Sequence, residues 1–283
     1  MQGECTVGYH RPDRVEDAFA ALAQGASVIA GGTDWYPSRG DGPLPKIILD
    51  VTRLPGFSGI TPEAGGWRIG AASSWTTLAK ADLPRCFDGL RAAAREVGSR
   101  QIQNTGTIGG NLCNASPAAD GVPALLTLDA SVRLVSDRGE RDLPLDAFIT
   151  GPRKTALGDG ELMASVWVPD PGPLVGAFQK LGARKYLVIS IAMVAALARV
   201  EAGRFTDVRV AVGACGPVAR RLEAVEQALS GKTLAEAETI IASVALPELS
   251  PISDVRGSAE FRLDVVRDMI LRALASTAGG DHG

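Results

Sequence analysis

The first fifty residues alternate between strand-like and helix-like patterns of apolar residues. Apolar side chains recur at helical spacing over residues 15–22, and Asp13 with Glu16 three residues later predicts a capping box that opens this helix. Short apolar runs at 27–30 and 46–51 predict buried strands, so this part of the chain is expected to form a β-α-β unit. Such a unit leaves its loops at the carboxyl ends of the strands, where ligands bind in open α/β sheets.

The middle of the chain combines further strands and helices with one polar stretch. Residues 101–112 join polar side chains to glycines, and we therefore expect a loop there rather than a helix or a strand. Apolar patterning predicts strands at 67–70, 130–135 and 162–168, and helices at 74–78, 89–97 and 118–126.

A proline-rich loop at 170–173 marks the expected boundary between two domains. Strands followed by helices are typical of an α+β domain, which is the class we expect beyond this loop. The predicted elements are three strands of an antiparallel sheet at 176–181, 186–200 and 206–213, and then helices at 222–229, 234–244 and 258–276.

Composition and charge narrow the class of protein. A chain of 283 residues accommodates about two domains, and its 46% hydrophobic and 22% charged residues are typical of a soluble globular protein. The net charge is −3 and the basic residues form no stripe, which disfavours nucleic acid as a partner. The longest apolar run, 186–198, is too short to cross a bilayer, and the N-terminus lacks the pattern of a signal peptide. We therefore expect a cytoplasmic protein.

Side chains that carry redox or nucleophilic chemistry are few and scattered. The chain has four cysteines without a C-x-x-C pair, which argues against a zinc ribbon or an iron–sulfur cluster within this chain. Its two histidines have no obvious nucleophile beside them. The demanding chemistry must then come from a bound cofactor or belong to a partner. The residues in question are Cys5, Cys86, Cys113, Cys215, His10 and His282.

Two glycine pairs, Gly31-Gly32 and Gly109-Gly110, stand where an apolar run changes into a loop. Glycines at such a place leave backbone N–H groups uncovered, so that a phosphate can approach to hydrogen-bonding distance. Two such loops are able to hold a diphosphate from both sides. The pattern therefore indicates a dinucleotide cofactor.

Each pair also has a simpler interpretation. The first is equally compatible with a tight turn in which Asp34 caps the next segment. The second belongs to the polar stretch 104–120, which is otherwise a long surface loop, and such loops are uncommon in compact domains unless they are functional. Hydroxyls of Thr107 and Ser116 can donate to phosphate oxygens, and Asp120 can accept from sugar hydroxyls. We therefore favour ligand binding for the second stretch.

Other nucleotide-binding motifs fit poorly. Residues 230–233, Ser-Gly-Lys-Thr, resemble the end of a P-loop, but Glu226 occupies the position of its first glycine and a helix precedes the motif. A helix end at Gly231, followed by a capping box of Thr233 and Glu236, explains the same residues. A G-x-G-x-x-G fingerprint does not occur in the chain.

Residues 30–34, Ala-Gly-Gly-Thr-Asp, and the stretch 104–120 together resemble the FAD-binding subunit of the molybdenum hydroxylases. This is the xanthine dehydrogenase and carbon monoxide dehydrogenase family. Further resemblances follow in the family's order at 151–155, 160–162, 166–169, 178–182 and 210–217, so that the similarity spans nearly the whole chain.

The resemblance implies an α+β protein with a vanillyl-alcohol-oxidase-like (PCMH-type) FAD-binding domain. This domain would cover residues 1–172, as two α/β subdomains of about 1–56 and 57–172. Residues 173–283 would form a C-terminal flavoprotein domain with a three-stranded antiparallel sheet and helices.

The resemblance also implies a set of FAD-binding residues. The first glycine loop would wrap the diphosphate, the second would approach it from the other side, and Ser116 with Asp120 would bind ribose or ribityl hydroxyls. Met163 and Val97 match apolar positions beside the cofactor, and Lys180 matches a lysine near the flavin ring. Trp35 departs from the aliphatic residue usual in the family. The implied set is Val28, Ile29, Ala30, Gly31, Gly32, Thr33, Asp34, Trp35, Thr107, Gly109, Gly110, Asn111, Ser116, Asp120, Met163 and Lys180, with no catalytic acid or base and no metal ligand.

The implied function is that of an electron-transfer component in a three-subunit complex. FAD in this chain would take electrons from 2Fe–2S clusters of a small partner subunit and pass them to NAD or another acceptor. A large partner subunit with molybdopterin would oxidise the substrate, which this sequence therefore does not identify. A self-sufficient flavin oxidoreductase of the same fold and an assembly or binding subunit without FAD are the alternatives.

Overall fold

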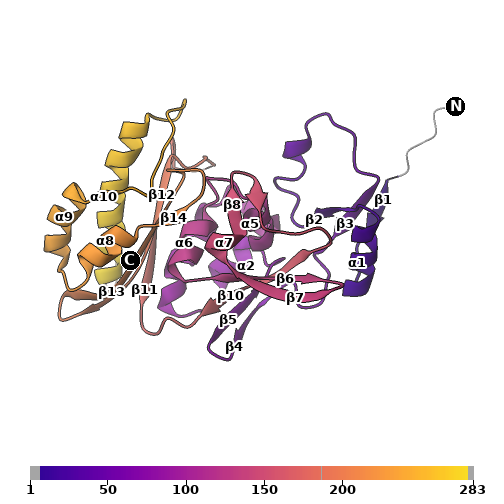
Figure 1. Ribbon diagram of the computed structural model, residues 1–283, viewed down its shortest axis with the longest axis horizontal. Helices are drawn as coiled ribbons and strands as arrows, with labels where there is room; N and C mark the ends of the chain where they lie inside the picture. The colour runs from indigo at the N-terminus through magenta and orange to yellow at the C-terminus, as the bar shows by residue number, and fades with distance from the viewer. Residues whose placement is uncertain (1–6, 186, 280–283) are drawn as a thin grey trace.

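The computed structural model describes residues 7–185 and 187–279. In Figure 1 the chain runs from an N-terminal unit in indigo, through a central part, to a C-terminal unit in orange and yellow. Expectations for Cys5 and His282, and for Tyr186 in the strand expected at 186–200, lie outside the described residues.

A small parallel sheet forms the N-terminal unit, as the β-α-β pattern predicts. β1 (Gly8–His10) and β2 (Ser27–Ile29) each pair in parallel with β3 (Ile47–Asp50), which lies between them. α1 (Val15–Ala23) connects β1 to β2, and the short 3-10 helix η1 (Pro37–Arg39) lies between β2 and β3. The carboxyl end of β2 therefore leads directly into the first glycine pair.

The beginning of α1 differs from the prediction. Arg14 is the N-cap residue, and its side chain makes no capping hydrogen bond to the first turn. The carboxylate of Glu16 lies 3.4 Å from the Arg14 guanidinium. The predicted capping box of Asp13 and Glu16 is therefore wrong, because the helix begins one residue later and Glu16 pairs with a charge instead.

An antiparallel sheet of five strands, in the order β4-β5-β10-β6-β7, forms the centre of the molecule. The three strands predicted here are confirmed, whereas the edge strands β4 and β7 are mostly exposed and lack apolar alternation. The strands are β4 (Ile60–Glu63), β5 (Gly66–Gly70), β6 (Ser131–Ser136), β7 (Gly139–Pro144) and β10 (Leu162–Pro169), with a separate hairpin of β8 (Ile149–Gly151) and β9 (Lys154–Thr155). The helices are α2 (Trp75–Lys80), η2 (Arg85–Phe87), α3 (Asp88–Glu96), α4 (Arg100–Thr105), α5 (Ile108–Asn114), α6 (Gly121–Thr127) and α7 (Leu145–Phe148).

The loop expected at 101–112 is wrong, because two short helices, α4 and α5, cover this stretch. Each is capped by a hydroxyl: the Ser99 side chain accepts from the N–H of Ile102, and the Thr107 side chain accepts from the N–H of Gly110. The polar residues that suggested a loop are therefore partly helix caps.

The C-terminal unit is a four-stranded antiparallel sheet with helices. β11 (Val175–Leu181), β12 (Ala192–Glu201) and β13 (Arg204–Gly213) are the three predicted strands, and the two-residue β14 (Arg220–Arg221) adds a fourth beside β13. The second strand begins only at Ala192, so the expectation of a strand is confirmed over 192–200 and wrong over 187–191. The helices are α8 (Glu223–Leu229), α9 (Leu234–Ser243), whose predicted capping box of Thr233 and Glu236 is confirmed, and α10 (Ala259–Ala278).

Both faces of the C-terminal sheet are covered. Met193 and Leu197 of β12 belong to a core shared with α3 and α6, whereas Val194 and Ala196 belong to the core under α10. Figure 1 shows α6 on one side of this sheet and α10 on the other. The period-2 alternation of a strand explains this division, because successive side chains point to opposite faces.

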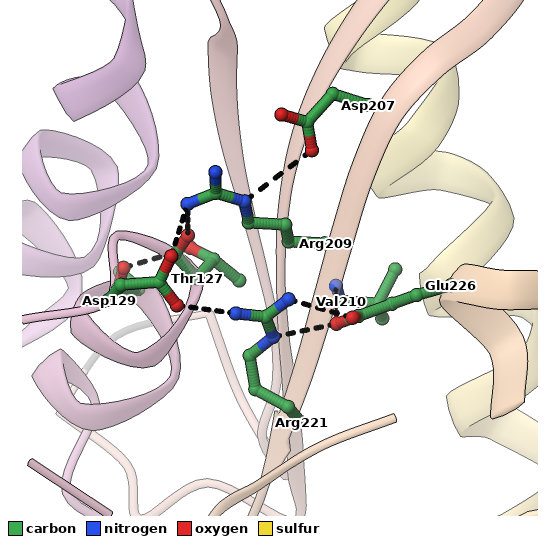
Figure 2. Close-up of polar contacts among 8 residues, drawn as sticks. Thr127, Asp129, Asp207, Arg209, Val210, Arg221 and Glu226 are labelled. Atoms are coloured by element: carbon green, nitrogen blue, oxygen red, sulfur yellow. Dashed lines mark hydrogen bonds and ion pairs between the residues drawn. The ribbon is translucent and has the colours of Figure 1, made fainter. Parts of the chain in front are cut away.

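The expected domain boundary at 170–173 falls between β10 and β11, and residues from both sides of it share one hydrophobic core. Charged side chains add to this contact (Figure 2). Asp129, just after α6, accepts hydrogen bonds from Arg209 of β13 at 2.7 Å and from Arg221 of β14 at 2.5 Å. Arg221 also pairs with Glu226 of α8 at 2.7 Å. The domain limits themselves stay a prediction.

Candidate cofactor-binding site

A cavity of about 320 Å³ lies where the loop after β2 faces α5. Most of the residues predicted to bind FAD line it, together with Val97. The sequence-predicted lining residues are Val28, Ile29, Ala30, Gly31, Gly32, Thr33, Asp34, Trp35, Thr107, Gly109, Gly110, Asn111 and Met163.

The first wall of the cavity is a loop that presents free backbone donors. Within the described chain, no group accepts a hydrogen bond from the N–H groups of residues 31–34. Gly32 has φ +70°, a conformation that favours glycine. A Cβ on Gly31 would lie 2.0 Å from the carbonyl oxygen of Thr105, so this loop fits closely against the end of α4. Successive free N–H groups in such a turn form a concavity suited to an anion.

The second wall, α5, is built differently from the prediction. The N–H of Gly109 donates to the carbonyl of Ala71 at 2.8 Å, and the N–H of Gly110 donates to the Thr107 hydroxyl oxygen at 3.0 Å. The expectation that the second glycine pair leaves its N–H groups uncovered is therefore wrong. Gly109 is needed for packing, because a Cβ there would lie 2.6 Å from the Cβ of Ala71.

Polar side chains of α5 remain available to a ligand. The hydroxyl hydrogen of Thr107 finds no acceptor in the part of the chain that the structure describes. The Oδ1 atom of Asn111 is buried and has no hydrogen-bond partner there. A buried polar atom without a partner is costly unless a ligand or water satisfies it. These two side chains therefore point to a polar ligand in this cavity.

Apolar side chains complete the lining, and the sequence reasoning missed several of them. Ile102 of α4 and Leu157 face the cavity, and so does Trp75 of α2. An apolar side chain in the sequence does not distinguish a residue of the hydrophobic core from one that lines a cavity. Cys113 and Asn114 also line the cavity and lie one helical turn beyond the second glycine pair. That glycine pair could therefore have identified them as candidate lining residues.

Glu161 adds a charge to the edge of the cavity. Its carboxylate is paired with Arg141 at 2.6 Å and also accepts a hydrogen bond from the N–H of Gly158 at 2.6 Å. The Arg141 hydrogen bond, aided by the one from Gly158, lowers the pKa of Glu161 to about 2. Glu161 is therefore an anion that is already compensated, and it does not compete for a cationic ligand.

Three predicted residues lie outside the cavity lining: Ser116, Asp120 and Lys180. Asp120 and Lys180 form a buried ion pair at 2.7 Å, with side chains 9% and 6% exposed. Ser190 donates to the other carboxylate oxygen of Asp120 at 2.6 Å. Burial raises the pKa of Asp120, against the opposing effects of Lys180 and Ser190. Contacts of these residues with FAD stay a prediction.

FAD suits this cavity in the chemistry of its walls. The free N–H groups of residues 31–34 match a diphosphate, the side chains of Thr107 and Asn111 match polar groups near it, and the apolar lining matches ring systems. Across residues 7–185 and 187–279, no group of three or more His, Cys, Asp or Glu side chains could hold a metal ion. Within the same residues, no helix has the length and apolar character needed to cross a membrane.

Known proteins resemble this chain over nearly its full length. Residues 4–171 match the FAD binding domain in molybdopterin dehydrogenase, and residues 177–277 match the CO dehydrogenase flavoprotein C-terminal domain. The xanthine dehydrogenase FAD-binding subunit of Escherichia coli O157:H7 is 34% identical, with 98% of each chain covered. The carbon monoxide dehydrogenase medium chain of Hydrogenophaga pseudoflava is 30% identical, with 94% of this chain and 95% of that one covered.

A solved structure, reconstituted CO dehydrogenase from Oligotropha carboxidovorans, superposes with a TM-score of 0.88 at 27% identity. The superposition covers 96% of this chain and 98% of that one. The expected α+β fold is therefore confirmed, and the two-sided cavity lies within the matched FAD-binding part. This chain belongs to the family of FAD-binding subunits of the molybdenum hydroxylases.

Proposed function

We propose that this chain takes electrons from 2Fe–2S clusters of a small partner subunit and passes them to NAD or another acceptor. A large partner subunit with the molybdenum cofactor would oxidise the substrate, and the complex would work in the cytoplasm. The names of the relatives, as FAD-binding subunits or medium chains, support an assembly with further subunits. The observation that carries the proposal is the cavity between the first glycine loop and α5.

Within this proposal the first glycine loop holds the diphosphate of FAD. The N–H groups of residues 31–34 donate to its oxygens, and the Thr107 hydroxyl donates from the other wall. The amide nitrogen of Asn111, another lining residue, can donate as well. Bound FAD supplies the capacity to carry two electrons and to release them as a hydride or singly.

The chain's other contribution is to shape the surroundings of the flavin. Val97, Ile102 and Met163 exclude water from one part of the cavity, which strengthens every electrostatic interaction there. We infer that Lys180 is the cation nearest the flavin ring and that Asp120 holds it in place through their buried ion pair. A cation beside the ring favours a reduced, anionic flavin.

Electron transfer to NAD is tested in the complex purified through a tag on this chain. The flavin content and the partner subunits are first identified by absorbance and mass spectrometry. NADH is then added without oxygen, and the flavin bands are followed in time. Loss of these bands supports NAD as the acceptor, because flavin–nicotinamide hydride transfer is reversible.

The other outcomes separate the alternatives. Flavin that resists NADH but is reoxidised by oxygen or by a dye excludes NAD and leaves another acceptor. Flavin in a chain that never copurifies with an iron–sulfur subunit contradicts the relay and supports a self-sufficient flavoprotein. A complex that contains iron–sulfur clusters but no FAD supports the assembly role.

A further inference from the structure

We propose that the indole of Trp35, backed by Arg39, is the surface on which the adenine ring of FAD stacks. The inference rests on the proposed binding of FAD in this cavity and adds a role for one end of the cofactor. The Trp35–Arg39 pair would then favour the binding of ligands that contain an adenosine diphosphate group.

The indole is placed beside the diphosphate cradle by the chain itself. Trp35 directly follows the free N–H groups of residues 31–34, and it lines the same cavity. A group that binds the cradle therefore brings its neighbouring substituent close to the indole. In FAD the substituents on the two sides of the diphosphate are the adenosine and the flavin.

The ring of Trp35 is held in one orientation by three contacts. Its Nε1–H donates to the Ser27 hydroxyl oxygen at 3.0 Å. The Arg39 guanidinium lies over the ring, 4.9 Å from its centroid, and the Tyr36 ring meets it edge to face at 4.9 Å. The Trp35 side chain is half-buried and is part of the cavity lining. A fixed aromatic surface loses little freedom when a base stacks on it, which favours binding.

Three of the other apolar lining residues, all from the central part of the molecule, assign the two ends of the cofactor. Val97 follows α3, Ile102 belongs to α4 and Met163 to β10, so these apolar residues come from the central part of the molecule. Trp35 comes from the N-terminal unit, just before η1. Since a diphosphate in the cradle has one ring system on each side, the apolar central wall suits the flavin and the indole suits the purine.

A cationic group behind the indole strengthens this assignment. The guanidinium of Arg39 attracts the π-electrons of Trp35 and so keeps the ring from turning away from the cavity. The Arg39 side chain is anchored in turn by a hydrogen bond to the carbonyl of Pro43. Arg39 thus acts as a positioning residue, while Trp35 is the residue that contacts the base.

The test compares three ligands on the complex from which FAD has been removed: FAD, ADP and FMN. Binding is followed by calorimetry for the wild type and for Trp35→Leu, which keeps an apolar side chain but removes the aromatic surface. Stacking of a base on an aromatic residue corresponds to about 5- to 150-fold in affinity. We expect Trp35→Leu to lower the affinity for FAD and for ADP by about tenfold each and to leave the affinity for FMN unchanged.

Matched variants control for indirect effects. Trp35→Phe keeps a stacking surface and should retain most of the affinity for ADP. Trp167→Leu makes the same chemical change at a half-buried tryptophan of β10 that lies outside the cavity lining. It should leave the affinity for all three ligands unchanged. Arg39→Met removes the cation behind the indole and should weaken ADP by about two- to fivefold. Thermal unfolding of each variant shows whether it is folded.

Two results overturn the proposal. If folded Trp35→Leu loses FMN as strongly as ADP, the indole contacts the flavin side or the diphosphate instead of the adenine. If it binds all three ligands like the wild type, the indole contacts none of them. Failure of the wild-type complex to bind FAD would contradict the proposed function instead, and the ADP measurements would still decide whether Trp35 binds a base.

Discussion

The contact between the first glycine loop and the end of α4 gives the sharpest test of the cavity. A Cβ on Gly31 would lie 2.0 Å from the carbonyl oxygen of Thr105 and 2.9 Å from the Cα of Gly106. An ordinary contact needs about 3.5 Å, so Gly31→Ala must separate the two segments by roughly 1.5 Å. Both neighbours are backbone atoms and cannot turn aside as a flexible side chain does.

The same displacement should affect both stability and cofactor binding. Overpacking of this kind costs about 1–3 kcal/mol in the free energy of unfolding. The loop that moves carries the N–H groups of residues 31–34, and a shift of this size removes at least one of their hydrogen bonds to the diphosphate. A hydrogen bond to a charged group contributes about 1.5–3 kcal/mol, which corresponds to about 10- to 150-fold weaker binding of FAD.

The assay combines thermal unfolding of the FAD-free complex with titration of FAD. Gly151→Ala is the matched control, because its added Cβ would meet only the Lys154 side chain, at an ordinary 3.9 Å. We expect the control to keep the unfolding midpoint and the affinity of the wild type, and Gly31→Ala to lower both. An alanine at position 31 that changes neither quantity would refute the close contact between the loop and α4.

Three further predictions concern other parts of the site. Gly110→Val should lower the unfolding midpoint, because the added Cβ would lie 2.9 Å from the Thr107 hydroxyl oxygen that caps α5, and should also weaken the binding of FAD by about 10- to 150-fold in titration, as the side chain enters the cavity. Asp120→Asn should lower the free energy of unfolding, measured in urea, by about 3–5 kcal/mol, because its partner Lys180 stays charged and buried. The control Asp207→Asn, at a more exposed ion pair, should lower the same free energy by less than about 1 kcal/mol. Arg141 lowers the pKa of Glu161 from 4.5 to about 2, so this stabilisation is complete above pH 4.5 and is lost as the pH falls toward 2. Glu161→Gln should therefore lower the free energy of unfolding at pH 6 and have almost no effect on it near pH 2, as measured by chemical denaturation. An equal effect at both pH values would show that the ion pair is not responsible.

The secondary structure was most predictable where burial on one face imposes a strict pattern. β12 and β13 are long and mostly buried, and their apolar runs identified them without other information. α10 and the capping box at Thr233 were equally clear, because spacing and cap residues agree. The predicted strand over 187–191 failed because an apolar run alone does not distinguish a strand from an irregular segment.

The stretch 101–112 shows where sequence patterns mislead. Its glycines and polar residues are typical of a loop, yet α4 and α5 form there because tertiary contacts override weak helix propensity. Gly109 and Gly121 pack against Ala71 and the Trp75 ring, at distances that no larger residue allows. No short-range pattern reveals such contacts, since they join residues far apart in the sequence.

The two glycine pairs therefore contribute to the site by different physical means. In the first pair, Gly32 adopts a left-handed backbone conformation and the following N–H groups remain free, which is the property that an anion requires. In the second pair, the N–H groups are already used within the fold, and the glycines allow α5 to approach its neighbours closely. The ligand-binding groups of that wall are instead the side chains of Thr107 and Asn111. Substitutions in the first loop should consequently change the affinity for any diphosphate. Substitutions of Thr107 or Asn111 should change the affinity by an amount that depends on which hydroxyls the ligand carries.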